Sequence, residues 1–301
     1  MPINISTSPA VFRWKPAAWL RVTGADAASF LQGQFTNDLR VSAAGSVYGL
    51  WLSLKGKVVA DSFVLRGADA EEWWVGSYFS RAAVILARLE GFVIADDVTF
   101  TDETDAWAGV SVLGAGAAEW LAAVRPPGAW VFSGRRGAGE SVECMFPIAG
   151  KEYSPWLDAL AARPEVAAHE MRLRRIMAGI PAVGEDVGET DLPNEAGLEL
   201  DAISYVKGCY LGQEVMARLK AMGQVRRHLE RVRGSESAPP GSLPAPLYAG
   251  GRMVGDLRSA VADGAGGWVG LAMLSLLHVA AGTRLALASD DGLPVERLGQ
   301  S

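Results

Sequence analysis

The chain has 301 residues and a formal net charge of −6; half of its residues are hydrophobic and 21% are charged. This length and composition allow two or three folded domains and exclude long disordered segments. The negative charge argues against a general nucleic-acid-binding surface, so we do not expect nucleic acid as a partner.

The sequence contains no run approaching 18 apolar residues, which argues against a membrane span. It does not open with a charged leader and an apolar core, so we expect a cytoplasmic protein without membrane contact. The two cysteines, Cys144 and Cys209, lie far apart and predict no disulfide framework. With only three histidines and no metal-ligand spacing, the chain alone is not expected to hold an iron–sulfur cluster or a zinc ion.

The first predicted elements are a strand over residues 20–24 and a helix that begins after Asp26 and runs toward Gln34. The segment QFTND follows, and it contains Asn37. The amide of Asn37 is suited to holding a turn or to hydrogen-bonding a polar ligand, and both interpretations stay open.

Three strand-like runs come next, over residues 46–54, 57–65 and 73–78, and their short connections predict a β-meander. Asp61 lies in the second run among apolar neighbours, where another apolar residue would suit a buried sheet better. Its carboxylate is therefore a candidate for a site.

An amphipathic helix over residues 80–91 and a strand lead to the segment VSVLGAGAAEWLAAV, which contains Gly114 and Gly116. This segment imitates a dinucleotide-binding fingerprint, but Glu119 stands where the third glycine belongs. We therefore predict a tight strand-to-helix turn here in preference to a nucleotide site.

Two strands, over residues 129–133 and 142–146, and a helix over 154–162 complete this α+β unit. An arginine-rich helix then runs from Pro164 to Ala178, and residues 181–200 predict a long ordered loop.

Near residue 234 the composition changes to a linker-like stretch, followed by short runs that glycines interrupt. These runs predict a small β-barrel over residues 234–301 that covers one side of the site. The predicted fold class is therefore α+β, with residues 1–233 forming two interleaved subdomains.

The most informative segment is KGCYLGQE, residues 207–214, which overlaps an amphipathic helix predicted over residues 213–222. Its two glycines permit backbone angles that other residues resist, so a turn in front of a helix N-terminus is expected. Helix amides and the ammonium of Lys207 would favour the thiolate of Cys209, which makes this residue a candidate reactive thiol. The alternative is a buried, inert cysteine.

KGCYLGQE resembles the signature of the YgfZ family, folate-binding proteins of iron–sulfur cluster assembly and repair that are related to the Iba-type assembly factor and the glycine-cleavage T-protein. Four further motifs support the resemblance in the expected order: FLQGQFTNDL (30–39), LKGKVVAD (54–61), AGIP (178–181) and LPNE (192–195). The resemblance covers residues 22–233. It implies a T-protein-like folate-binding fold with a C-terminal β-barrel, tetrahydrofolate as the cofactor, and iron–sulfur enzymes or cluster assembly proteins as partners.

The sequence also departs from the T-protein pattern. The T-protein has two adjacent aspartates in one strand, of which one acts at the folate, and here the pair reads Ala60-Asp61. Met177 stands where the T-protein has a glutamate that contacts the pterin, and a thioether is only a weak acceptor. Cys209 occupies a position where the T-protein carries an acidic residue. These departures disfavour aminomethyl transfer.

A tetrahydrofolate site needs an apolar slot for the ring, an acceptor for its edge and cations for the glutamate tail. The candidates are Tyr48, Trp51 and Tyr210 for the slot, Asn37 and Asp61 for the edge, and Lys207, Arg218 and Arg226 for the tail. Gln213 and Glu214 are further candidates as ligands or as caps of their own helix, and for Trp51 a core position is favoured over the slot. An ion pair between Glu214 and Arg218, four residues apart, would explain both residues without a ligand.

Three functions are compatible with these residues. The preferred one is a tetrahydrofolate-binding accessory protein for iron–sulfur enzymes, with Cys209 as a reactive thiol. The alternatives are a folate-dependent transferase of the aminomethyltransferase type and a folate-binding module without chemistry.

Overall fold

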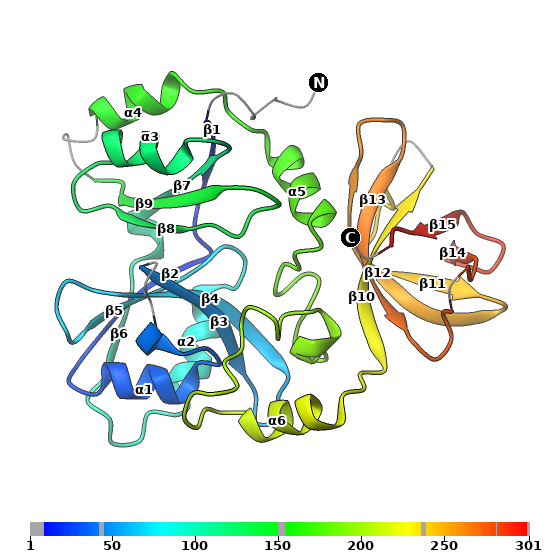
Figure 1. Cartoon of the computed structure of the whole chain (residues 1–301), viewed down its shortest axis with the longest axis horizontal. Helices are drawn as coiled ribbons and strands as arrows, with labels where there is room; N and C mark the ends of the chain where they lie inside the picture. Colours follow the sequence, from blue (N-terminus) through cyan, green and yellow to red (C-terminus); the bar gives the residue numbers. More distant parts are fainter. Residues whose placement is uncertain (1–8, 42–44, 150–153, 236–238, 281, 300–301) are drawn as a thin grey trace.

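The computed structural model describes residues 9–41, 45–149, 154–235, 239–280 and 282–299. The described chain forms three lobes, two antiparallel sheets with helices and one closed β-barrel (Figure 1). The two sheet lobes lie on one side of the molecule and the barrel on the other, with α5 between them. Within the described residues, no helix has both the length and the apolar character needed to cross a membrane.

The first lobe is a five-stranded sheet in the order β3-β4-β5-β2-β6. Its strands are β2 (Ala18–Thr23), β3 (Ser46–Leu52), β4 (Val58–Arg66), β5 (Glu72–Ser77) and β6 (Thr99–Asp102). Two helices, α1 (Ala27–Gln34) and α2 (Ala82–Glu90), pack on one face of the sheet through apolar residues such as Leu31 and Ile85. The adjacent, antiparallel β3, β4 and β5 confirm the predicted meander.

The second lobe is a four-stranded sheet in the order β1-β7-β9-β8. Its elements are β1 (Ala10–Trp14), β7 (Trp107–Leu113), α3 (Ala117–Val124), β8 (Trp130–Ser133), β9 (Ser141–Pro147) and α4 (Ser154–Ala161). Two short 3-10 helices lie in connections: η1 (Leu39–Val41) joins α1 to β3 within the first lobe, and η2 (Thr104–Ala106) joins β6 of the first lobe to β7 of the second. Because β1 belongs to this sheet while the next five strands belong to the other, the two lobes are interleaved in sequence.

An aromatic layer fills the space between the two sheets. The ring centroids of Trp19 and Trp74 are 5.6 Å apart, and Phe63 of β4 lies 5.1 Å from Phe132 of β8. Successive side chains of a strand point to opposite faces, so Asp61 shares the face of β4 that carries Phe63. The carboxylate of Asp61 is therefore directed toward the second lobe.

The glycine-containing segment after β7 forms the tight turn predicted from the sequence. Gly114 and Gly116 have φ angles of +95° and +77°, which residues with a Cβ rarely adopt. The helix α3 begins directly after this turn.

The arginine-rich helix α5 (Ala168–Met177) begins later than predicted. Its expected first turn instead extends along β1, where the Val11 amide donates to the Pro164 carbonyl and the Val166 amide donates to the Val11 carbonyl. These hydrogen bonds to a distant strand replace the helical ones. The chain then runs through a loop that contains η4 (Pro193–Glu195) to α6 (Gln213–Met222), whose bounds agree with the prediction.

A buried ion cluster fixes the loop between α5 and α6. Asp191 is fully buried and accepts hydrogen bonds from Arg258 at 2.7 Å and from Arg227 at 3.1 Å. Burial opposes ionisation, but the hydrogen bonds from Arg258 and from the Gly188 amide hold the pKa of Asp191 below its ordinary value. Glu195 of the LPNE motif also accepts from Arg227, at 2.9 Å. The cluster therefore joins the loop to two barrel strands.

The third lobe is a closed barrel in the order β10-β13-β12-β11-β14-β15. Its strands are β10 (Arg227–Gly234), β11 (Ala245–Ala249), β12 (Arg252–Ala262), β13 (Trp268–Ser275), β14 (Leu285–Leu287) and β15 (Pro294–Arg297). The barrel thus includes a strand that precedes the expected boundary at residue 234. Leu229 and Val232 of β10 lie on opposite faces of the strand, because they are three positions apart: Val232 packs in the barrel core, and Leu229 packs in the apolar cluster that the barrel shares with the loop between α5 and α6.

We expect Asp191→Ala to reduce the free energy of unfolding by about 3 kcal/mol, because Arg227 and Arg258 lose the fully buried carboxylate that they share and keep only Glu195 and Asp256 as partners. The measurement is denaturant unfolding followed by circular dichroism. Glu214→Ala, which removes an exposed ion pair of α6, is the matched control and should change stability by about 0.5 kcal/mol or less. Equal effects of the two substitutions would contradict the role assigned to the cluster.

Candidate functional site

The segment 207–212, which we call the thiol loop, is anchored by a buried lysine. Lys207 is 4% exposed. Its ammonium donates to three backbone carbonyls, those of Gln32 at 2.7 Å, Phe35 at 2.6 Å and Asn37 at 2.9 Å. These carbonyls lie at and just beyond the C-terminal end of α1, where the helix dipole favours a cation. Lys207 therefore fixes the thiol loop to α1.

Burial has an electrostatic effect on this ammonium. It lowers the pKa of Lys207 to about 8, with Asp38 acting in the opposite direction and Arg40 adding to the decrease. The expected role of Lys207 as a cation at the mouth of a ligand site is corrected by this geometry. All three of its hydrogens are directed to carbonyls inside the protein.

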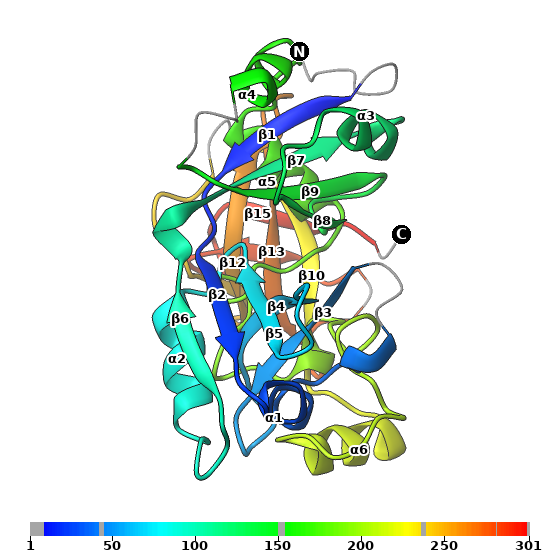
Figure 2. The ribbon, with the colours of Figure 1, turned by 90° about the vertical axis from the view of Figure 1, so that its left-hand side faces the viewer.

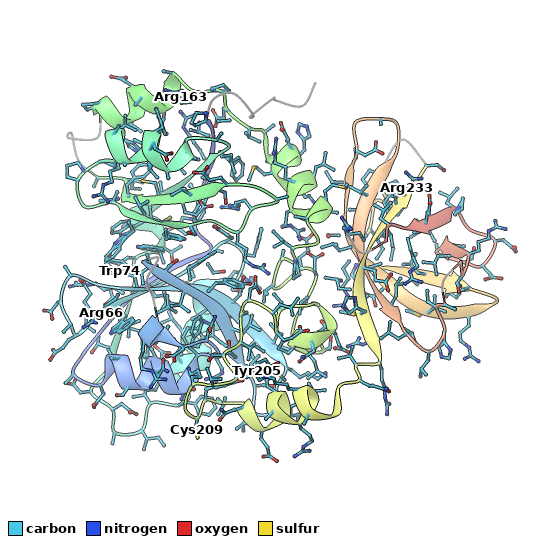
Figure 3. All side chains as sticks on the ribbon, viewed as in Figure 1. Arg66, Trp74, Arg163, Tyr205, Cys209 and Arg233 are labelled. Carbon is cyan, nitrogen blue, oxygen red and sulfur yellow. The ribbon has the colours of Figure 1, made fainter. Side chains whose placement is uncertain are left out.

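Cys209 is exposed at the surface of the thiol loop. Figure 3 shows it at the edge of the molecule, at the end where α1 and α6 lie in Figure 1 and Figure 2. A second anchor lies on the C-terminal side of Cys209, where the Leu211 amide donates to the Gly33 carbonyl at 3.2 Å. Gly212 has a φ of +88° and leads into α6, and a Cβ at this position would lie 3.1 Å from the Ser53 carbonyl oxygen. The thiol is thus presented to solvent on a fixed backbone.

The second cysteine has the opposite environment. Cys144 lies in β9, is fully buried, and packs among the apolar residues beneath α3 and α4. Burial, with a smaller contribution from Glu143, raises the pKa of Cys144 to about 12. The chain therefore contains one accessible thiol and one inaccessible thiol.

Tyr210 and Trp51 are core residues. Tyr210 is 6% exposed, and its ring lies 5.3 Å from the Lys207 ammonium nitrogen. Trp51 is fully buried, packs on Phe35 and donates its indole N–H to Ser62 Oγ at 2.8 Å. Neither ring is available as the wall of an open slot: Trp51 has the core position that the sequence favoured, and the expectation for Tyr210 is corrected.

The candidates on and after α6 do not converge on a ligand site. Glu214 and Arg218 form the exposed ion pair that was the alternative to a ligand role, with 2.5 Å between their charged atoms. Gln213 is half-buried at the first position of α6, and Arg226 is exposed just before β10. The structure keeps these four residues apart from Asp61.

Asp61 is the centre of a second group of polar residues. It is 4% exposed, and one carboxylate oxygen accepts hydrogen bonds from Ser77 Oγ at 2.8 Å and Ser80 Oγ at 2.6 Å. The other oxygen accepts from the Tyr48 hydroxyl at 3.0 Å. Ala60 points to the opposite face of β4, into the core beneath the helices. Asp61 is therefore the member of the Ala60-Asp61 pair that faces the other polar residues.

Two residues that the sequence did not single out, Arg135 and Asp201, complete this group. The Arg135 guanidinium carbon lies 4.5 Å from the centre of the Tyr48 ring. Its Nε donates to Asp201 Oδ2 at 2.9 Å. We call Tyr48, Asp61, Arg135 and Asp201 the central cluster. No linear signal marks Arg135 or Asp201, because each lies in a loop among other charged residues.

Asn37 connects the central cluster to the thiol loop. Its side-chain amide donates to the backbone carbonyls of Tyr48 at 2.9 Å and Asp201 at 3.0 Å. Its own backbone carbonyl accepts from Lys207. Of the two roles that the sequence left open for Asn37, the structure shows the holding of loops, and both amide hydrogens are used in it.

Large apolar side chains remain exposed in the segments around the central cluster. Phe79, in the turn that brings Ser80 to Asp61, is 38% exposed, and Met177, at the end of α5, is 44% exposed. The Arg175 guanidinium carbon of α5 lies 5.7 Å from the Phe79 ring, so these segments are neighbours. Leu200, next to Asp201, is 84% exposed. Such residues are suited to contact the faces of a flat ring.

The expected single site is therefore two separate features. No hydrogen bond, ion pair or ring contact among the described residues joins Cys209 directly to Asp61, and the segment from Gly33 to Asn37 contacts both the thiol loop and the central cluster. A candidate thiol lies at the outer edge, and a candidate ligand site lies between the lobes.

Comparison with known proteins relates the chain to proteins of matching architecture. The family described as the GCVT N-terminal domain matches residues 5–129. The tRNA-modifying protein YgfZ of Edwardsiella ictaluri is 32% identical over 246 residues, which cover 75% of this chain and 71% of that protein. The human mitochondrial iron–sulfur cluster assembly factor IBA57 is 28% identical over 324 aligned positions, covering 93% of this chain and 83% of the relative.

A solved structure shows the same fold. The glycine cleavage system aminomethyltransferase T from Bartonella henselae superimposes with a TM-score of 0.80, covering 98% of this chain and 86% of that one. The sequence identity is 18%, so this similarity shows the fold alone. It confirms the predicted fold class, a T-protein-like α+β fold with a C-terminal barrel.

We predict that Ellman's reagent modifies one thiol per chain in the folded protein and two after unfolding in guanidinium chloride, because Cys209 is exposed and Cys144 is buried. The reaction is followed by absorbance under both conditions. Cys209→Ser should abolish the fast reaction of the folded protein, whereas Cys144→Ser should leave it unchanged. Fast modification of both cysteines in the folded protein would contradict the burial of Cys144.

Lys207 should give stability a measurable pH dependence. Its pKa is lowered to about 8 from 10.5, so between these values the unfolded chain binds the proton more tightly than the folded chain. The free energy of unfolding should therefore rise with pH over this window, by at most about 3 kcal/mol. The test compares denaturant unfolding of the wild type and Lys207→Met from pH 8 to pH 10, with Lys55→Met as the exposed control. An identical pH slope in all three proteins would contradict the assignment.

Proposed function

We propose, from the premise that this chain belongs to the YgfZ family, that it is a tetrahydrofolate-binding accessory protein for the assembly or repair of iron–sulfur enzymes. The observation that carries the proposal is the exposed thiol of Cys209 on a loop that a buried lysine anchors. The relatives named as iron–sulfur cluster assembly factors, of which human IBA57 is one, support the choice of partners. As the compartment we propose the cytoplasm.

The environment of Cys209 fits a thiol that makes transient contacts. A structural cysteine is packed as Cys144 is, whereas a thiol that meets a cluster, a thiol adduct or a client protein has to be accessible. Fixing the backbone on both sides reduces the entropy that the loop loses when a partner binds. Cys209 is accessible and fixed, and it is the residue we propose to act on the partner.

The residues around the central cluster fit a folate. Exposed apolar side chains at Phe79 and Met177 can contact the ring faces, and Arg135 and Asp201 offer a hydrogen-bond donor and an acceptor for its polar edge. A bound tetrahydrofolate supplies a carrier for one-carbon units. The protein residues would bind and orient it between the lobes.

The transferase alternative retains one supporting observation. Asp61, and not Ala60, faces the central cluster, so the carboxylate that remains of the aspartate pair is on the side of the candidate ligand site. Three hydroxyl groups already donate to this carboxylate, which suits a structural acceptor better than a base. A transferase should lose turnover on Asp61→Asn with a tetrahydrofolate acceptor and an aminomethyl donor. An accessory protein has no such turnover to lose.

The accessory function predicts that Cys209→Ala separates folate binding from activity in cells. The affinity for tetrahydrofolate, measured by calorimetry, should stay within about twofold, because Cys209 does not contact the central cluster. In cells that lack the wild-type chain, the specific activity of an iron–sulfur enzyme should fall by about tenfold or to the level without the protein.

Cys144→Ala is the matched control for this experiment. It removes the other thiol from a buried site and should preserve both binding and cellular activity, provided that circular dichroism shows a folded protein. Full cellular activity of Cys209→Ala would overturn the role of the thiol. A wild-type protein that binds no tetrahydrofolate would overturn the folate part of the proposal.

A further inference from the structure

We propose that Arg135 and Asp201 are the specificity-determining pair of the candidate ligand site, and that they recognise the lactam edge of a pterin ring with its adjacent amino group. This inference rests on the proposed folate binding and adds the recognition element to it. Neither residue was singled out by the sequence.

The pair is formed by segments that only the fold brings together. Arg135 follows β8 in the second lobe, and Asp201 lies in the loop that leads to the thiol loop. Their side chains meet at 2.9 Å over Tyr48 of β3, which belongs to the first lobe. Three parts of the chain therefore converge on one guanidinium and one carboxylate.

The two residues are held before any ligand arrives. The backbone amide of Arg135 donates to the Tyr78 hydroxyl at 3.3 Å, and the guanidinium lies on the Tyr48 ring. The backbone carbonyl of Asp201 accepts from the Asn37 amide. A pair that is fixed in this way loses little freedom on binding, which favours affinity and selectivity.

The pair also keeps hydrogen-bonding capacity for a ligand. The ion pair uses Nε of Arg135, and no hydrogen bond from Nη1 or Nη2 to another described residue is formed; the Arg135 side chain is 17% exposed. Asp201 has a side chain that is 51% exposed, and its Oδ1 accepts no hydrogen bond from a described residue. The free atoms are therefore N–H donors next to a carboxylate acceptor.

This arrangement matches one class of ligand edge. A lactam with an adjacent amino group presents a carbonyl acceptor beside N–H donors, so the guanidinium can donate to the carbonyl while the carboxylate accepts from the N–H groups. The carboxylate of Asp61 has less capacity to accept hydrogen bonds from a ligand than that of Asp201, because three hydroxyl groups already donate to it. Asp201 thus provides the accessible carboxylate that Met177 does not provide.

The experiment measures selectivity in addition to affinity. Calorimetry gives dissociation constants of the wild type, Asp201→Asn and Arg135→Gln for tetrahydrofolate and for its analogue without the 2-amino group. We expect the wild type to bind tetrahydrofolate about tenfold or more tightly than the analogue, since a polar group that loses its partner is costly. Asp201→Asn should bring this ratio close to one, and Arg135→Gln should weaken both ligands by about tenfold.

A matched pair on the barrel serves as the control. Arg233 and Glu296 are exposed and 2.8 Å apart, and Figure 3 shows Arg233 on the barrel, on the opposite side of the molecule from Cys209. Arg233→Gln and Glu296→Gln should leave both dissociation constants unchanged. Thermal unfolding of each variant reports whether it is folded, and the near-isosteric Asp201→Asn keeps the test valid if Arg135→Gln is unstable.

The outcomes separate this inference from the function on which it rests. If the wild type binds tetrahydrofolate and Asp201→Asn keeps the wild-type ratio, the inference is overturned and the proposed folate binding stands. The third ligand is p-aminobenzoylglutamate, which lacks the pterin ring. If Asp201→Asn and Arg135→Gln both weaken its binding, the pair binds the glutamate tail of the folate, and the inference is overturned. A wild type that binds neither folate overturns both proposals.

Discussion

The ammonium of Lys207 and its three carbonyl partners are the interaction on which the arrangement of the site depends. A lysine is rarely buried, because removing its charge from water is unfavourable unless hydrogen bonds compensate. Here the compensation comes from the C-terminal end of α1, so the thiol loop has one position relative to the first lobe. Through Asn37 the same contact extends to Tyr48 and Asp201. One buried charge thereby relates an outer thiol to an inner polar cluster without direct contact between them.

Buried ion pairs act in a similar way on the barrel. Asp191 binds arginines from β10 and β12, and the backbone carbonyl of Asp186 accepts from Arg258 of β12 at 3.0 Å, while its carboxylate joins the same loop to Arg175 of α5. Such pairs add little net stability compared with apolar packing, but leaving one partner alone is costly. They therefore serve to define one docking position for the barrel. The acidic, glycine-containing loop between α5 and α6 is the element that supplies these carboxylates.

The sequence predicted those parts of the fold whose signals are local. The bounds of α6 followed from its amphipathic spacing, and the meander and the turn at Gly114 followed from strand patterns and glycines. The start of α5 was missed because hydrogen bonds to β1, more than 150 positions earlier in the chain, override the helical preference.

The site was predictable only in part. Cys209 and Asp61 stand out because a thiol between glycines and a carboxylate in an apolar strand are locally unusual. The contacts of Lys207 depend on tertiary packing, since a lysine in a loop is expected to face solvent. Arg135 and Asp201 have no local signal at all, because their pairing requires the second lobe to pack on the first.

The position of β1 has a consequence for how the chain is made. This strand pairs with β7, Ala10 with Leu113, so about one hundred further residues must be synthesised after it before its edge is covered. Until then an unpaired strand is open to wrong associations, and contacts between such distant segments form slowly. The crossover that joins the two sheets into one unit therefore leaves the edge of β1 uncovered until β7 has been made.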